Sequence, residues 1–198
     1  RSTLFPYTTL FRSHGDHYAA QNQFLDRPGT RIMGLTHEEM VGFWGMKNYP
    51  EERVEFDLGG RRLLVWGNPG HIDSEFAYYD PYTQILFTGD MFYRGRCYIG
   101  NFSMWMASMR RLLAFTETHP VRHIVGCHIE ISRTGGDYPR GTTWQPDEPP
   151  LQMDVAMLRR TYQFAQSITK PGIYFTGDVY LCNQTRGRTT IEKNPYAY

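Results

Sequence analysis

The sequence predicts a layered α/β domain with its functional groups on one edge of a sheet. Two observations predict the fold class: short apolar runs come in pairs around turn residues, and longer stretches place apolar residues at helical spacing. A third observation predicts the site. Three apolar runs end at a Gly that is followed closely by His71, Asp90 or His128. In layered α/β folds such residues gather on the loops at one edge of the sheet.

The bulk composition limits the class of protein. The 198 residues, 40% hydrophobic and 15% aromatic, suit one domain with a sizeable core. The net charge is +1 and there is no basic stripe, which argues against nucleic acid as the main partner. No run approaches the roughly 18 apolar residues of a membrane span. Cys97, Cys127 and Cys182 are too few and too scattered for a disulfide framework or a zinc knuckle.

The first thirteen residues have a separate interpretation. Residues 1–13 can be back-translated into a string that resembles a widely used short-read sequencing adapter. We interpret them as a non-native, adapter-derived segment and exclude them from fold reasoning. The alternative is a genuine, slightly apolar strand. On the adapter interpretation, residues 14–198 form a truncated domain, and the cellular location stays unknown, with the cytoplasm as the default expectation.

A polar cluster, His14-Gly15-Asp16-His17, follows directly. Two imidazoles and a carboxylate within four residues cannot all lie in an apolar core, and they are good ligands for a divalent ion such as zinc. Gly15 lets the backbone approach closely. Taken alone, the cluster also suits a solvated polar turn.

The next segment predicts two short elements and a capped helix. Residues 18–25 suggest a short helix, and residues 32–33 a short buried strand. Thr36 and Glu39 have the spacing of a capping box at the start of a helix. That box makes His37 an exposed first-turn residue rather than a ligand.

Two β-hairpins follow. The first has the turn Gly59-Gly60 and the second the turn Asp80-Pro81. Their strands are expected at residues 53–58, 61–66, 76–79 and 85–88. The second strand of the first hairpin leads to His71, and that of the second hairpin leads to Asp90.

The second half of the chain adds two helices and two strands. Ser103 is the predicted N-cap of a helix that runs to about residue 118. Residues 121–125 predict the buried strand before His128. An amphipathic helix is predicted over residues 151–165, and a final strand over residues 173–182.

Two stretches carry weaker signals. The Pro-rich, aromatic segment at residues 138–150 predicts either a lid across the site or a connecting arm, and the sequence favours neither. Phe-Thr-Gly-Asp178 repeats the sequence Phe-Thr-Gly-Asp90. Because Asp178 falls inside the predicted final strand and after the last histidine, we interpret the repeat as coincidence.

The order of these polar residues resembles that of the metallo-β-lactamase-fold hydrolases, and the runs around His71 and Asp90 are similar to the glyoxalase-II-like branch. The resemblance extends to about residue 132. The matching residues are His14, Asp16, His17, His71, Asp90 and His128. The resemblance implies an αββα sandwich, here incomplete because most of the first half-sheet is missing, with two divalent metal ions, usually zinc, at one edge of the sheets.

The resemblance also implies a ligand set. The first site takes His14, His71 and the bridging Asp90, and the second takes Asp16, His17, Asp90 and His128. The family signature begins with a His at position 12, where this chain has Arg12. The first site is therefore expected to be weakened, and the second to survive better.

The implied activity is hydrolysis of an ester, thioester or lactone by a zinc-bound hydroxide. Asp16 is the implied catalytic residue, because it orients the nucleophile. Tyr93, Arg94 and Arg96 follow Asp90 and are candidates to contact an anionic group of a small-molecule substrate, the alternative being a solvated loop. The truncated chain is expected to be impaired as an enzyme.

Other functions stay open at this point. Asp90 stands where several β-lactamase subclasses have Cys, so antibiotic hydrolysis is not favoured. The alternatives are a non-catalytic metal-binding module of the same fold, and a phosphodiesterase or nuclease on that fold. Neither a nucleic acid nor a membrane is expected as a partner, and the oligomeric state is not predicted.

Overall fold

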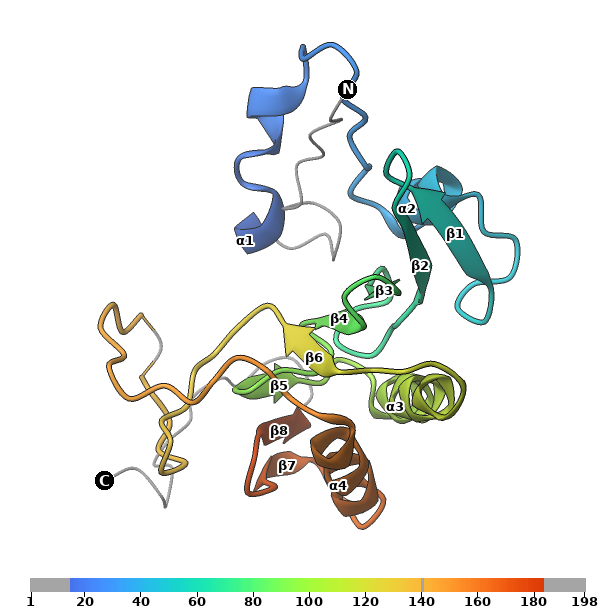
Figure 1. Ribbon diagram of the computed structural model, residues 1–198. Helices are drawn as coiled ribbons and strands as arrows, with labels where there is room; N and C mark the ends of the chain where they lie inside the picture. Colours follow the sequence, from blue (N-terminus) through green and yellow to red (C-terminus); the bar gives the residue numbers. More distant parts are fainter. Residues whose placement is uncertain (1–14, 140, 184–198) are drawn as a thin grey trace.

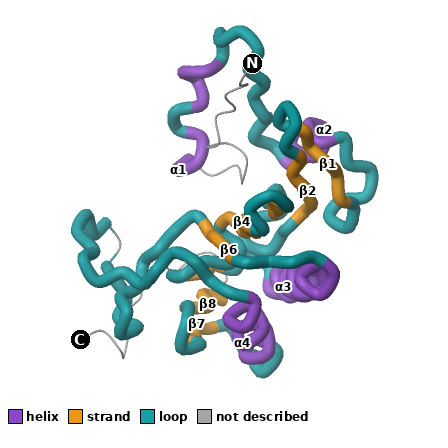
Figure 2. Tube along the Cα trace, viewed as in Figure 1, coloured by secondary structure: helices purple, strands orange, loops and turns teal. Residues whose placement is uncertain are grey.

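The structure, a computed structural model, describes residues 15–139 and 141–183 (Figures 1 and 2). The predicted adapter-derived segment, residues 1–13, lies outside the described residues, as does His14. Within the described part, no helix has the length and apolar content needed to cross a bilayer.

Five strands form the main sheet, in the order β1-β2-β3-β4-β6. They are β1 (Arg53–Asp57), β2 (Arg62–Gly67), β3 (Phe76–Asp80), β4 (Ile85–Gly89) and β6 (His123–Gly126). The first four pair antiparallel, whereas β6 pairs with β4 in parallel. Because of these directions, β2, β4 and β6 all end at the same edge of the sheet.

A smaller sheet has three strands in the order β5-β8-β7. They are β5 (Arg96–Tyr98), β7 (Gly172–Phe175) and β8 (Tyr180–Asn183). The helical segments are α1 (Gly15–Tyr18), the 3₁₀ turn η2 (Gln21–Phe24), α2 (His37–Trp44), α3 (Phe102–Thr118) and α4 (Val155–Ala165). Figure 1 shows α3 and α4 together, with α2 away from them beside β1 and β2.

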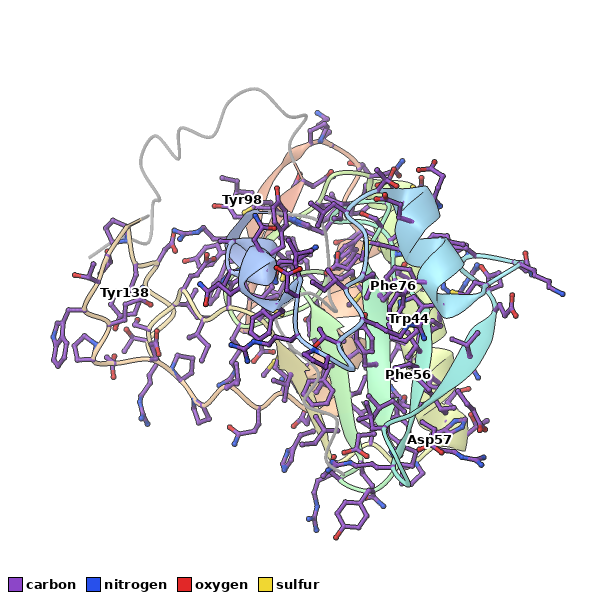
Figure 3. The ribbon with its side chains drawn as sticks, turned by 90° about the horizontal axis from the view of Figure 1, so that it is seen from above. Trp44, Phe56, Asp57, Phe76, Tyr98 and Tyr138 are labelled. Atoms are coloured by element: carbon purple, nitrogen blue, oxygen red, sulfur yellow. The ribbon has the colours of Figure 1, made fainter. Side chains whose placement is uncertain are left out.

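Alternate residues of β2 and β3 pack on opposite faces of the main sheet. On one face, Trp66, Ala77 and Tyr79 belong to a core cluster that includes the apolar side of α3 and part of α4. On the other face, Phe76 and Tyr78 pack with the buried side chains of α2. Figure 3 shows Trp44, Phe56 and Phe76 in this second cluster. The sheet therefore lies between helices, which confirms the predicted layered α/β class.

Both predicted hairpins are confirmed. Arg53 pairs with Trp66 and Asp57 with Arg62 in the first, and Asp80 pairs with Ile85 in the second. The first turn is tight because the Asp57 carboxylate accepts hydrogen bonds from the amides of Gly59 and Gly60, at 2.8 and 2.7 Å. Both glycines have a positive φ, of 90° and 97°, which a residue with a Cβ adopts only with strain.

The capping box of α2 is also confirmed. The Thr36 hydroxyl accepts from the Glu39 amide at 3.2 Å, and the Glu39 carboxylate accepts from the Thr36 amide at 3.0 Å. His37 lies in the first turn as predicted but is half-buried rather than exposed. Its Nδ1 lies 3.2 Å from the Asp73 carbonyl oxygen, and its ring contacts Tyr49 edge-on.

Two predictions near the N-terminal side were wrong. Residues 18–25 do not form one helix, because α1 ends at Tyr18 and η2 is a separate 3₁₀ turn. Residues 32–33 do not form a strand, although Met33 is only 2% exposed. Met33 is buried from a loop, in the same cluster as α2, so its burial needs no sheet partner.

The N-cap of α3 was predicted two residues too late. Asn101, not Ser103, is the N-cap, because its side-chain oxygen accepts from the Met104 amide at 3.1 Å. The Ser103 hydroxyl donates to that same oxygen at 2.9 Å. Both residues are good caps by type, and only the backbone geometry selects one of them.

The predicted final strand at residues 173–182 is in fact the hairpin of β7 and β8. The Thr176 hydroxyl accepts from the Val179 amide at 3.2 Å, and Gly177 has a φ of +92°. Asp178 therefore lies in a turn and not within a strand. Its carboxylate accepts from the Arg160 guanidinium at 2.8 Å. This ion pair explains the presence of Asp178 without any role in the candidate metal centre.

The described residues of the segment 138–150, which leave out residue 140, are irregular and are held in place by a few hydrogen bonds. The Tyr138 hydroxyl accepts from the Asp147 amide at 3.0 Å, and the Arg94 guanidinium donates to the Pro150 carbonyl at 3.1 Å. Figure 3 shows Tyr138 in a loop that projects beside the sheet, and Trp144 is 76% exposed.

Candidate metal centre

The candidate site lies where β4 and β6 end side by side. Gly89 pairs with Gly126 in the parallel register, and the Cys127 amide donates to the Gly89 carbonyl at 3.0 Å. Asp90 follows β4 directly and Cys127 follows β6 directly, so the chain leaves the sheet at the same place after both strands. His128 follows directly.

Asp90 is the centre of this group. Its carboxylate is buried, with 2% of the residue exposed. Oδ2 accepts from His128 Nε2 at 3.0 Å, and Oδ1 lies 3.6 Å from Nε2 of His17 on α1. The two imidazole rings meet edge-on, with centroids 5.7 Å apart. Each carboxylate oxygen therefore faces one imidazole nitrogen.

A buried carboxylate, Glu75, holds the backbone of Asp90. Glu75 is 0% exposed, and its Oε1 accepts from the Asp90 amide at 2.6 Å. Gly89 makes this approach possible. It has a φ of +60°, and a Cβ built on it would lie 2.6 Å from that same Oε1. The Gly-Asp90 sequence is thus explained by both the backbone conformation and the closeness of Glu75.

His71 lies in the loop after β2, at the same edge of the sheet, and is 9% exposed. Its Nδ1 is 2.6 Å from the Tyr98 carbonyl oxygen. A carbonyl only accepts, so Nδ1 carries the proton and, in the neutral ring, Nε2 carries the lone pair. Fixing the tautomer through Nδ1 in this way is typical of metal-binding histidines.

The three residues predicted to contact substrate differ in their surroundings. Tyr93 is 1% exposed, its hydroxyl donates to the Arg96 carbonyl, and its ring contacts His128 edge-on at 5.3 Å. Arg96 is 5% exposed and forms ion pairs with Glu130 at 3.3 Å and Asp137 at 2.8 Å. Arg94 is half-buried. Their role toward a substrate stays a prediction.

The structure thus brings together three of the predicted ligands, His17, Asp90 and His128. It also adds two residues that the sequence did not single out. Cys127 has its Sγ in the same cluster as ligand atoms of His17 and Asp90, all within 4.8 Å of one another. Glu75 holds the backbone of Asp90 by accepting a hydrogen bond from its amide. The sequence signal for Cys127 was its place between Gly126 and His128, whereas no sequence signal pointed to Glu75.

Two predicted ligands cannot be placed. His14 lies outside the described residues. The side chain of Asp16 does too, although its backbone belongs to α1. Their ligand roles, and the catalytic role of Asp16, stay predictions.

The donor set fits a divalent metal ion. Imidazole nitrogen, carboxylate oxygen and cysteine sulfur are the ligand types that zinc takes in proteins. Here they come from three separate segments and converge within a few ångströms.

Comparison with known proteins agrees with this chemistry. A family model described as the metallo-beta-lactamase superfamily matches residues 13–144, more than half of the chain. The chain belongs to the metallo-β-lactamase superfamily. Its mixed α/β architecture with two sheets matches the fold of this superfamily, as the sequence predicted.

Curated relatives within the superfamily include two hydroxyacylglutathione hydrolases. The one from Brucella anthropi is 30% identical over 113 residues, which cover 56% of this chain and 42% of the relative. The one from Rhizobium meliloti is 29% identical over 107 residues, covering 52% and 41%. The chain thus spans less than half the length of these relatives. They confirm the resemblance to the glyoxalase-II-like branch of the superfamily.

A solved metallo-β-lactamase structure has a similar fold. The crystal structure of VMB-1 aligns with a TM-score of 0.50 and 17% sequence identity, over 84% of this chain and 68% of that one. At this identity the likeness concerns the fold alone.

Proposed function

We propose that this chain carries the metal centre of a hydrolase that cleaves a small-molecule ester, thioester or lactone. The observation that supports the proposal most is the Asp90 carboxylate, whose two oxygens each face an imidazole nitrogen, of His17 and of His128. This places the Asp90 carboxylate between two imidazoles of the proposed second metal site. The curated relatives, named hydroxyacylglutathione hydrolases, support an acyl substrate.

The residues that would hold the metal ions divide into two sets. His14, His71 and Asp90 would serve the first site, and Asp16, His17, Asp90 and His128 the second. Bound there, a divalent ion such as zinc supplies a Lewis acid that polarises a carbonyl group and acidifies water. The replacement of the signature His by Arg12 weakens the first site on this proposal.

The other residues of the centre position these ligands. Glu75 fixes the backbone of Asp90 through the short hydrogen bond to its amide. The Tyr98 carbonyl fixes the ring of His71 through Nδ1. Tyr93 packs against the ring of His128. Arg94, beside Tyr93, is a candidate to meet an anionic group of the substrate, as are Tyr93 and Arg96.

The test combines metal analysis with a substrate panel. We expect zinc to copurify with the protein, and we expect an Arg12→His variant to bind more zinc per chain than the parent chain does. The zinc-loaded protein is assayed on thioester, lactone, ester, β-lactam and phosphodiester substrates. Turnover confined to the first three supports the proposal.

The matched variant for the panel is His128→Ala, which should abolish turnover. Zinc binding without turnover of any substrate would instead favour the non-catalytic metal-binding module. Turnover confined to phosphodiesters would favour the phosphodiesterase or nuclease alternative.

A further inference from the structure

Cys127 lies inside the candidate metal centre, although the family resemblance assigns it no role. The Cys127 amide donates a hydrogen bond to the Gly89 carbonyl at 3.0 Å. Because Asp90 follows Gly89, this bond holds Cys127 close to Asp90. The Cys127 Sγ, a ring nitrogen of His17 and an oxygen of Asp90 all lie within 4.8 Å of one another. Three donors of different chemical types are thus within reach of a single ion.

We propose that Cys127 is a thiolate ligand of the metal ion held by His17 and Asp90, and that the centre therefore prefers Zn²⁺ or Co²⁺ to Mg²⁺ and Mn²⁺. Thiolate ligands select thiophilic ions, whereas carboxylate and water ligands suit Mg²⁺ and Mn²⁺. When Sγ binds, the thiol proton leaves to the solvent. This inference rests on the metal-binding part of the proposed function and adds a ligand to it.

The other two cysteines serve as internal controls. Cys97 is 0% and Cys182 5% exposed, whereas Cys127 is half-buried at the end of β6. Burial raises the pKa of the Cys97 thiol well above its ordinary value and that of Cys182 to about 12. Near neutral pH both stay protonated and out of reach, so they react slowly with alkylating reagents.

The first experiment is an alkylation footprint of the unmodified full chain. The protein is treated with iodoacetamide after zinc loading or after removal of zinc with a chelator, and each cysteine is followed by peptide mass spectrometry. We expect Cys127 to be the most reactive cysteine in the metal-free protein. Zinc should slow its alkylation by about tenfold or more and leave Cys97 and Cys182 unchanged.

The second experiment separates direct ligation from simple shielding by a nearby ion. Co²⁺ bound to a thiolate has a sulfur-to-metal charge-transfer absorption in the near ultraviolet. The Co²⁺-loaded protein should show this band, Cys127→Ser should lose it, and Cys182→Ser should keep it. Cys127→Ser should also bind Zn²⁺ on the order of tenfold or more weakly, with a smaller change for Mn²⁺.

The outcomes separate the two proposals. If no zinc or cobalt binds at all, both the metal centre and the role of Cys127 are wrong. If metal binds but Cys127 stays as reactive as in the chelated protein, only the role of Cys127 is wrong. Protection of Cys127 without a charge-transfer band would likewise overturn ligation by sulfur while leaving the metal centre intact.

Discussion

Two buried aspartates lie at opposite ends of strand β4, and they differ in what surrounds them. Asp80 ends β3, just before the turn into β4, and Asp90 follows β4 directly; each is 2% exposed. Asp80 lies at the edge of the sheet that carries the hairpin turns. Asp90 lies at the opposite edge, where β2, β4 and β6 end.

Asp80 is compensated by Arg61 from the first hairpin and by two residues that follow it in the chain. Its carboxylate accepts from the Arg61 guanidinium, from the Thr83 hydroxyl at 2.6 Å and from the Tyr82 amide at 3.0 Å. Burial raises the pKa of Asp80, but these hydrogen bonds outweigh it, and the pKa lies below its ordinary value of 3.8. This carboxylate has a structural role in the turn.

Asp90 faces imidazoles instead of a guanidinium. His17 and His128 offer imidazole nitrogens, a ligand type that zinc takes in proteins, and a sulfur atom lies in the same cluster. Burial alone therefore does not distinguish a candidate metal ligand from a structural carboxylate. The chemical type of the facing groups does. A guanidinium and nearby backbone amides are typical of a carboxylate that stabilises a turn, whereas converging imidazole and thiol groups are typical of a metal site.

The largest effect is expected from Asp90→Asn. The substitution keeps the size of the side chain but removes the negative charge that faces both imidazoles, so zinc affinity should fall by more than about 100-fold. Chelator competition measures the affinity. Asp80→Asn is the matched control and should bind zinc as the parent chain does. An equal loss in both variants would contradict the functional difference between the two aspartates.

The next effect is expected at Glu75, behind Asp90. Glu75→Ala removes the acceptor of the Asp90 amide, and supporting residues of this kind typically contribute about 10- to 100-fold in metal affinity. Glu75→Gln keeps a carbonyl oxygen in that place and should recover most of the affinity. The same chelator titration measures both variants. If Glu75→Gln weakens zinc binding as much as Glu75→Ala does, the hydrogen bond from the Asp90 amide does not determine the zinc affinity.

A smaller effect, on stability rather than on metal, is expected from Asp80→Asn. The Arg61 side chain is 49% exposed, so solvent screens the ion pair and the loss should be about 1 kcal/mol. Because the folded pKa of Asp80 is lowered, its contribution is present above the ordinary value of 3.8 and is lost as the pH falls through the folded pKa. Urea unfolding at pH 7 and at pH values below 3.8 measures the difference between variant and parent, which should shrink at the lower pH.

The smallest effect is expected from Asp178→Asn, in the repeated Phe-Thr-Gly-Asp sequence. Asp178 accepts from Arg160, whose side chain is 56% exposed, so the pair should contribute no more than about 0.5 kcal/mol. Zinc affinity should not change. A loss of zinc in this variant would mean that the repeat of the Gly-Asp90 sequence is functional after all.

Much of the fold could be predicted because the signals are local. The turn at Gly59-Gly60, the capping box of Thr36 and Glu39, and the amphipathic pattern of α4 each depend on residues within a few positions of one another. The predictions that were wrong concern choices between neighbouring candidates. Asn101 and Ser103 are both good caps, and residues 173–182 suit one long strand as well as a hairpin, so backbone geometry had to decide.

For the candidate site, the sequence by itself determined the order of the candidate ligands: a polar cluster with His17 comes first, and His71, Asp90 and His128 each follow a strand end that is visible in the apolar pattern. Only the tertiary structure decided what lies across from them. The parallel register of β4 and β6 brings Cys127 beside Asp90, and the loop before β3 brings Glu75 against Gly89. Such neighbours are set by the pairing of strands far apart in the chain, and no local pattern of residues encodes that pairing.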